Sequence, residues 1–284
     1  MKCIHHSDID GHCAGNIVAI YEKNFNPEDY IEMDYVARLP LEKIKKGERV
    51  YIVDYSFSIN TESVLDSLLE ITSDIIWLDH HASSVELIEK RPDFGKIKGV
   101  RQEGISGAAL AYMFLANLEY EKIPEYVKYV SDFDCWLLTM PNVMDFKFGV
   151  EGNDHSVLSK LWENFFKDQK DNIFLNQVIN YGKYANEYSK VEYARYLEDY
   201  GYETEVDGLK CLAVNRRSFS AIFGEKLKEY PLCMVWVYDG KTNKYSYSIY
   251  SSKPETVNCS KIAQKFGGGG HPSAAGFSSD RYMF

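Results

Sequence analysis

The stretch IIWLDHHASS, residues 75–84, joins a short apolar run to three side chains that can hold a metal ion. Residues 75–78 have the length and composition of a buried strand, and Asp79, His80 and His81 follow them directly. A strand that ends in a carboxylate and two imidazoles indicates a polar site at its end.

Two further apolar runs end in the same way. Residues 2–4 lead into the segment HHSDIDG, and residues 49–53 lead into Asp54. Helical patterns follow at residues 13–21 and 61–70, so strands and helices alternate. This alternation predicts an α/β domain with a mostly parallel sheet flanked by helices. A further strand is expected over residues 30–36, and a further helix over residues 154–166.

The three polar clusters share one edge of the sheet if the strands run parallel, and ligands bind beyond that edge. An aspartate after a strand can also be the N-cap of the next helix. However, so many carboxylates and imidazoles in one place would repel each other strongly without a cation. The pattern therefore predicts bound divalent ions. The set is His5, His6, Asp8, Asp10, Asp54, Asp79, His80 and His81.

Mixed carboxylate and imidazole ligands favour Mn²⁺ or Mg²⁺, with Fe²⁺, Co²⁺ or Zn²⁺ as alternatives. A cysteine-rich zinc site is not indicated, because Cys13 and Cys135 lack partners at ligand spacing. The six cysteines form no CxxC pair, and we expect reduced thiols in a cytoplasmic protein. No apolar run approaches the roughly 20 residues that span a bilayer, so no membrane partner is expected.

The net charge of −10, from 42 acidic and 32 basic residues, argues against a general grip on long nucleic acid. It is compatible with a short anionic substrate held at a site where metal ions supply positive charge. The oligomeric state, monomer or homodimer, is left open.

The pattern of predicted secondary structure changes at two places along the chain. Residues 1–170 form the expected catalytic domain, residues 171–204 read as a helical linker, and residues 205–284 read as a smaller α/β domain. In that second domain, glycine backbone N–H groups can come close to a phosphate because no Cβ intrudes. Asn215 and Arg216 follow a predicted strand and are expected either to contact substrate or to lie in a solvated turn. The expected substrate-binding groups are Asn215, Arg216, Gly268, Gly269, Gly270 and His271.

Five short motifs occur in a recognisable order. HSDIDG (6–11), VDYS (53–56), LDHH (78–81) and VSDFDCW (130–136) resemble the four motifs of the DHH phosphoesterase superfamily. FGGGGHPSAAGF (266–277) resembles the glycine-rich signature of the DHH-associated substrate-binding domain. Together they cover nearly the whole chain. The resemblance implies two domains joined by a helical linker, with the active site in the cleft between them.

The resemblance also implies a dinuclear metal centre in which Asp54 bridges the two ions. On this pattern Asp79 would accept a hydrogen bond from an imidazole and fix its tautomer, and His81 would contact the substrate phosphate. Asp134 is interpreted as a nearby hydrogen-bonding acid. The implied ligands are His6, Asp8 and Asp54 for one ion, and Asp10, Asp54, His80 and Asp132 for the other.

The sequence departs from the superfamily pattern at two places. The first histidine lies two residues before Asp8 instead of four, so either His5 or His6 is a candidate ligand, and His6 is preferred. Tyr250 stands where many nuclease-type members carry an arginine. This second departure puts the identity of the substrate in question.

The resemblance implies a hydrolase that cleaves phosphodiesters with a metal-activated water. We expect short single-stranded oligonucleotides as substrates, cut from an end as by a nanoRNase or exonuclease, with two ions, Mn²⁺ above all. The catalytic groups would be His81, Asp79 and His271. Hydrolysis of a cyclic dinucleotide or of 3′-phosphoadenosine 5′-phosphate is the alternative, and a non-catalytic nucleotide-binding module is a different class. Trp136 is expected in the core, with stacking on a base as the alternative.

Overall fold

The computed structural model describes residues 1–34, 38–217 and 219–284. The chain divides into two compact units, Met1–Asn186 and Glu187–Phe284. We describe each unit by itself.

The first unit is built on a five-stranded sheet in the order β2-β1-β3-β4-β5, and every pair in it is parallel. The predicted α/β architecture with a mostly parallel sheet is thereby confirmed. The order means that the chain reverses its direction of winding at β1, which lies between β2 and β3. The strands are β1 (Lys2–His6), β2 (Tyr30–Met33), β3 (Val50–Val53), β4 (Ile75–Asp79) and β5 (Lys98–Arg101).

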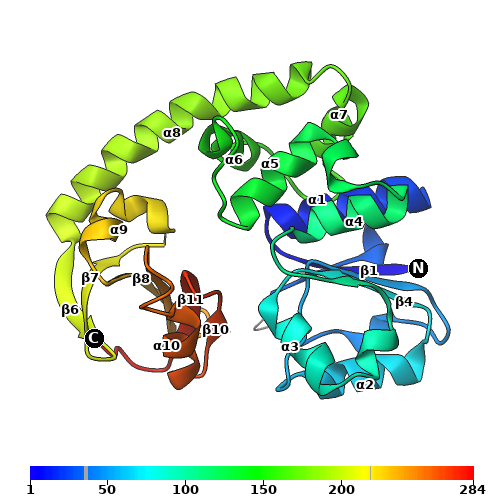
Figure 1. Cartoon of the computed structure of the whole chain (residues 1–284), viewed down its shortest axis with the longest axis horizontal. Coiled ribbons are helices and arrows are strands. Elements are labelled where there is room, and N and C mark those ends of the chain that lie inside the picture. The colour runs from blue at the N-terminus through cyan, green and yellow to red at the C-terminus, as the bar shows by residue number, and fades with distance from the viewer. Residues whose placement is uncertain (35–37, 218) are drawn as a thin grey trace. The chain divides into compact units, whose positions relative to one another are not determined.

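Successive side chains of the buried strands point to opposite faces of this sheet. In β3, for example, Tyr51 and Val53 join the apolar cluster on one face, and Ile52 joins the cluster on the other. Figure 1 shows helices on both faces, which explains why the strands are apolar on both sides. One face is covered by α2 (Glu62–Ile71) and α3 (Ala82–Lys90), and the other cluster draws on α1 (Ile9–Glu22), α4 (Gly107–Ala116), α5 (Glu125–Asp134), α6 (Val143–Glu151) and α7 (Lys160–Asp168).

Two sequence expectations differ from the observed elements. The strand predicted over residues 30–36 ends at Met33, and residues 35–36 lie outside the described part of the chain. The helix predicted over residues 154–166 begins only at Lys160, because the preceding segment is a loop tied to α1, where the amide of Asn16 donates to the carbonyl oxygen of Val157.

Helix α8 (Ile173–Tyr200) lies within the segment 171–204 that was expected to be a helical linker. The assignment of 1–170 and 205–284 to catalytic and substrate-binding roles stays a prediction. Among the described residues, no helix is both long and apolar enough to cross a membrane.

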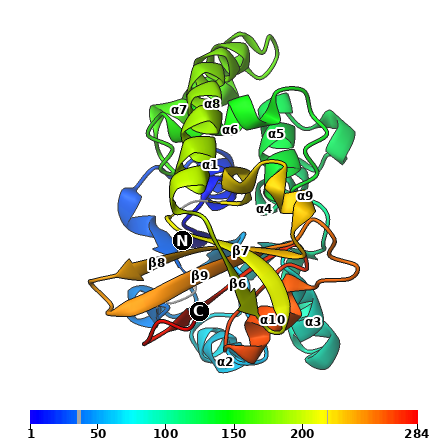
Figure 2. The same ribbon diagram turned by 90° about the vertical axis from the view of Figure 1, so that its left-hand side faces the viewer.

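The second unit carries a six-stranded mixed sheet in the order β10-β11-β9-β8-β7-β6, in which only β7 and β8 run parallel. Figure 2 shows these strands with α10 beside them. The elements are β6 (Tyr202–Val206), β7 (Leu209–Asn215), α9 (Lys226–Glu229), β8 (Leu232–Asp239), β9 (Lys244–Tyr250), α10 (Cys259–Lys265), β10 (Gly269–Gly270) and β11 (Ala274–Ser279).

Candidate metal centre

The polar residues collect at the carboxyl ends of β1, β3 and β4, where the winding of the sheet reverses. His6 is the last residue of β1, Asp54 directly follows β3, and Asp79 is the last residue of β4. In open parallel sheets this reversal leaves a crevice beyond the strand ends, which is the general location of ligand sites.

Asp54 is held in an unusual and costly state. Its backbone has φ 52°, a left-handed conformation that non-glycine residues rarely adopt, and the residue is 1% exposed. Neither carboxylate oxygen makes a well-formed hydrogen bond within the described part of the chain. Burial, with the nearby charges of Asp10 and Asp8, raises the pKa of Asp54 well above its ordinary value. A divalent cation would compensate this buried carboxylate, so the site fits a metal.

Asp54 and two neighbours form the first group of potential ligands. The Nδ1 atom of His6 lies 2.8 Å from Asp8 Oδ2 and 3.9 Å from Asp54 Oδ2. Asp8 is fixed as the N-cap of α1, where its other oxygen accepts a hydrogen bond from the Gly11 amide at 2.9 Å. Ligand atoms of His6, Asp8 and Asp54 lie within 4.8 Å of one another.

His80 is the centre of the second group. Its Nε2 lies 3.2 Å from Asp54 Oδ1 and 3.1 Å from Asp134 Oδ2, and its Nδ1 lies 3.9 Å from the sulfur of Cys135. Burial disfavours a charged imidazole here, but the nearby carboxylates of Asp134 and Asp54 outweigh it and raise the pKa of His80. A proton on His80 therefore balances part of the negative charge that a metal ion would otherwise neutralise.

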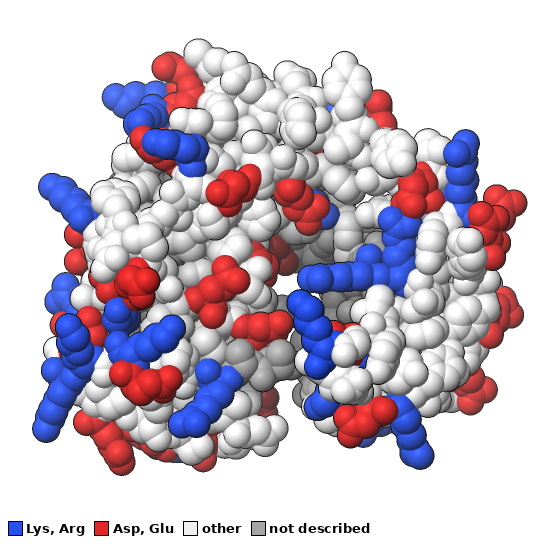
Figure 3. Space-filling view, turned by 180° about the vertical axis from the view of Figure 1, so that it is seen from behind, with Lys and Arg blue, Asp and Glu red and all other residues white. Residues whose placement is uncertain are grey.

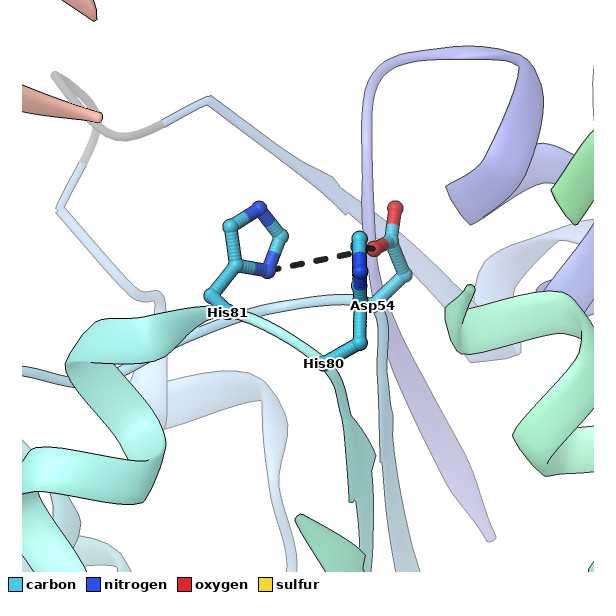
Figure 4. Close-up of side chains that lie close together, drawn as sticks. All are labelled: Asp54, His80 and His81. Atoms are coloured by element: carbon cyan, nitrogen blue, oxygen red, sulfur yellow. Dashed lines mark ion pairs between the residues drawn. The ribbon is translucent and has the colours of Figure 1, made fainter. Parts of the chain in front are cut away.

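The Asp79-His81 pair has the geometry of an oriented imidazole. His81 Nδ1 lies 2.8 Å from Asp79 Oδ1, and the fully buried Asp79 also accepts a hydrogen bond from the Ser84 hydroxyl. In Figure 4 a dashed line joins His81 Nδ1 to Asp54 Oδ1, which are 4.0 Å apart. The contact of Nδ1 with Asp79 fixes the orientation of the His81 ring.

Asp10 lies at the edge of this cluster and bonds mainly to helix α4. One of its oxygens accepts from the Gly107 amide at 2.7 Å and the other from the Ala108 amide at 3.0 Å. Its Oδ2 is 4.0 Å from His80 Nε2. Burial, then the charge of Asp134, raises the pKa of Asp10 to about 6. The expected ligand thus also anchors the start of α4 against the site.

Asp132 occupies a different place from the one expected for a ligand. Its oxygens accept hydrogen bonds from the Thr139 amide at 3.0 Å, the Thr139 hydroxyl at 2.6 Å and the Met140 amide at 3.0 Å. Asp134 instead lies beside His80. Two residues apart on α5, these side chains project about 200° from each other, so only one can face His80. The structure therefore places Asp134 beside His80, and the ligand role expected of Asp132 stays a prediction.

His5 and His6 point to opposite sides of β1, as alternation along a strand requires. His5 is 1% exposed and its Nδ1 bonds to the His6 carbonyl oxygen at 2.8 Å, while its ring lies 5.6 Å from that of His12. Burial lowers the pKa of His5 to about 4. Of the two candidates, the structure brings His6 together with Asp8 and Asp54.

The sequence did not indicate the contributions of Cys135 and Gly107. Cys135 belongs to a possible ligand group with His80 and Asp134, although it has no sequence partner at ligand spacing. A further group consists of Asp54, His80 and His81. A Cβ atom on Gly107 would lie 2.5 Å from the Cβ of Asp54 and 3.0 Å from Asp10 Oδ2.

The glycine-rich segment of the second unit forms part of its sheet. β10 pairs with β11, and a Cβ on Gly268 or Gly270 would lie within 2.6 Å of the backbone of β11. Gly269 has open space around it. The amide of His271 donates to the Ala274 carbonyl at 2.7 Å, which closes a tight turn. Close packing of strands therefore explains two of these glycines without a ligand.

Asn215 and Arg216 are both engaged within the second unit. The side-chain amide of Asn215 donates a hydrogen bond to the backbone carbonyl oxygen of Trp236 at 3.0 Å. The Arg216 guanidinium pairs with Glu192 at 2.6 Å and lies over the rings of Tyr193 and Tyr196. Their expected roles in substrate binding stay predictions.

Comparisons with known proteins give a fold and one sequence relative. No protein-family model matches the chain. The uncharacterized protein R106 of Acanthamoeba polyphaga mimivirus is 26% identical over 247 residues, which are 84% of this chain and 54% of that protein. The chain thus spans about half the length of the curated relative that it matches.

Three solved structures are similar across almost the whole chain. A DHH domain from a protein described as belonging to a family of ribosomal proteins has a TM-score of 0.56 and 14% identity, over 96% of this chain and 81% of that one. An exopolyphosphatase-related protein from Bacteroides fragilis has a TM-score of 0.53 and 14% identity, over 99% and 88%. A pGpG-specific phosphodiesterase from Vibrio cholerae has a TM-score of 0.52 and 11% identity, over 98% and 92%. This chain therefore shares the fold of these solved structures, one of which is described as a DHH domain.

Proposed function

We propose that this protein is a divalent-metal-dependent phosphodiesterase that hydrolyses short single-stranded oligonucleotides. The observation that carries the proposal is the buried Asp54 carboxylate, which belongs to two groups of potential ligands, one with His6 and Asp8 and one with His80 and His81. Asp134 lies 3.1 Å from His80. The Asp54 carboxylate is suited to bridge two cations. When bound, the ions supply the Lewis-acid activation of water and phosphate on which this class of hydrolysis depends.

The residues of the chain take separate parts in this proposal. Asp54, His6, Asp8, His80 and Asp134 would hold the ions, with Asp10 at the edge of the set. His81 would contact the phosphate, with its ring oriented by Asp79. No protein nucleophile is needed, since water is the attacking group.

Charge supports a small substrate. The net charge is −10, and Figure 3 shows acidic and basic side chains interspersed over the visible surface. A protein that grips long nucleic acid normally presents an extended basic surface. We therefore place dinucleotides and short oligomers first. Cyclic dinucleotides and 3′-phosphoadenosine 5′-phosphate are the alternatives, and Mn²⁺ is the proposed ion.

The test is a panel assay with Mn²⁺ on dinucleotides, 20-mers, a cyclic dinucleotide, the bisphosphate and pyrophosphate. We expect turnover of the shortest diesters, and loss of at least about a hundredfold in kcat for His80→Ala. Asp154→Asn, a change at an exposed acid outside the cluster, is the matched control. Full activity of His80→Ala would remove its proposed ligand role. Binding of dinucleotide without any turnover would instead indicate a nucleotide-binding module.

A further inference from the structure

The loop after α5 displays apolar side chains next to the metal centre. Asp134 and Cys135 at its start lie against His80. The next three residues are Trp136, Leu137 and Leu138, and they are 38%, 54% and 38% exposed. Trp136 was expected in the core, so this exposure is a departure from the sequence prediction. Exposed apolar side chains that lie together beside a polar site are typical of a ligand-binding surface.

This loop is rigid, because every backbone amide from Cys135 to Met140 has an acceptor. Four of these amides donate to carbonyl oxygens in the last turn of α5, at distances of 2.9–3.3 Å. The remaining two, on Thr139 and Met140, donate to the carboxylate of Asp132. Asp132 is 3% exposed, so a buried charge is used to hold the loop in place.

The loop also has a strained backbone. Trp136 and Leu138 have φ 55° and φ 53°, in the left-handed region that bulky residues rarely adopt. Strain of this kind persists only where surrounding contacts impose it, and such positions cluster at ligand sites. Here the hydrogen bonds to Asp132 and to α5 impose it. The result is a preorganised platform whose apolar side chains remain partly exposed.

We propose that Trp136 is a stacking platform for the nucleobase next to the scissile phosphate. This inference rests on the proposed phosphodiesterase function and narrows its substrate class to diesters that carry a base. The Trp136 ring packs edge-on against Phe133, with ring centroids 5.7 Å apart and planes at 64°. Aromatic stacking tolerates any base, which suits an enzyme of low sequence preference. Asp132 is then a positioning residue that holds the platform.

The kinetic test compares Trp136→Leu with Trp136→Phe in the full-length, metal-loaded protein. The substrates are a dinucleotide and the same diester without bases. We expect Trp136→Leu to lower the preference for the dinucleotide, measured as the ratio of the two KM values, about 5- to 150-fold. Trp136→Phe should retain most of this preference. An unchanged ratio in Trp136→Leu would overturn the stacking role and assign the loop to another contact. A thermal shift with Mn²⁺ equal to that of the wild type shows that each variant is folded.

A binding test separates this inference from the proposed function. Tryptophan fluorescence is followed as adenosine 5′-monophosphate or inorganic phosphate is added to the protein with Mg²⁺. Trp77 and Trp162 are fully buried, so an exposed ring such as Trp136 is the more accessible reporter. We expect quenching by the nucleotide, not by phosphate, and loss of that quenching in Trp136→Phe. This result would stand even if no diester were hydrolysed. Equal quenching in wild type and Trp136→Phe would contradict the inference.

Discussion

The buried carboxylate of Asp54 is the central group of the candidate metal site. A buried carboxylate with no well-formed hydrogen bond costs the apoprotein free energy, since water no longer solvates the charge. Its neighbours Asp8 and Asp10 add repulsion. The cost is recovered when cations bind. A residue that destabilises the metal-free protein is thus also well placed to bind metal.

The substitution Asp54→Asn tests whether the charge of Asp54 both destabilises the metal-free protein and is required for metal binding. Because the pKa of Asp54 is raised in the folded state, its ionised form weakens folding above the ordinary carboxyl pKa, and an amide removes that charge. We expect the metal-free variant to be more stable by about 1–3 kcal/mol in urea unfolding. Its stabilisation by excess Mn²⁺ should disappear. Lower stability without metal, or an intact Mn²⁺ effect, would contradict the role of Asp54. Asp154→Asn is the control.

Asp134 and Asp132 should respond differently to the same substitution. Asp134→Asn removes a charge beside His80, so we expect Mn²⁺ affinity to fall about 10- to 100-fold by calorimetry, as for perturbed metal sites. Asp132→Asn places an amide N–H₂ group against donors in the 139–140 turn. It should lower stability by about 1–3 kcal/mol with little change in Mn²⁺ affinity. The reverse pattern would restore Asp132 as the ligand.

At the scale of elements, α4 and the strand ends are built to approach each other closely. Asp10 accepts hydrogen bonds from two backbone amides in the first turn of α4, an arrangement that the helix dipole favours. Helix α4 and Asp54 can approach so closely because residue 107 is a glycine, which has a hydrogen atom in place of a Cβ. The site therefore requires α1, α4 and β3 to be placed together.

Gly107→Ala tests this contact between elements. The added methyl would lie 2.5 Å from the Asp54 Cβ, so α4 or Asp54 must shift. We expect a loss of about 1–3 kcal/mol in stability, as for overpacked cores, and weaker stabilisation by Mn²⁺. Gly95→Ala is the control, because nothing lies within 4 Å of its added Cβ. Equal behaviour of the two variants would show that the contact relaxes at no cost.

A histidine pair joins α1 to the loop before α7 and makes that contact sensitive to acid. His12 Nδ1 lies 3.0 Å from His155 Nδ1, and His12 Nε2 lies 2.8 Å from Glu32. Burial, then the neighbouring His12, lowers the pKa of His155 in the folded state. The buried His5 adjoins the pair.

The sign of the effect follows from that lowered pKa. A neutral His155 favours folding above the unfolded-state pKa of about 6.5, and this contribution is lost as the pH falls below it. The pKa values of His80, Asp10 and Asp54 are raised and act in the opposite direction, so the test is the difference between two proteins. As the pH falls from about 7.5 to about 5.5, we expect the urea midpoint of the wild type to decrease relative to that of His155→Gln. A pH dependence unchanged in His155→Gln would exclude the pair as its source.

At the scale of the whole molecule, the potential metal ligands found among the described residues all belong to the unit Met1–Asn186. Two compact units joined through α8 are expected to unfold in two calorimetric transitions, since proteins with several domains depart from two-state behaviour. Mn²⁺ should raise the midpoint of one transition only, by preferential binding to the folded first unit. A single transition that moves as a whole with Mn²⁺ would show that the units unfold together.

Some of this protein could be predicted from local pattern alone. Short apolar runs ending in Asp54 and in the 79–81 triplet indicated parallel strands with a polar edge, because strand composition and strand termini are local properties. The long helix near residues 173–200 follows from local signals for the same reason.

The choice of side chains within the site came only from the tertiary structure. The pairing of Asp10 with the Gly107 amide joins residues 97 positions apart, and the position of Asp134 rather than Asp132 beside His80 depends on how α5 is rotated against the sheet. Such contacts depend on packing between distant segments, which no local pattern encodes. The sequence by itself therefore determined the chemistry available at the sheet edge, and packing decided which atoms meet there.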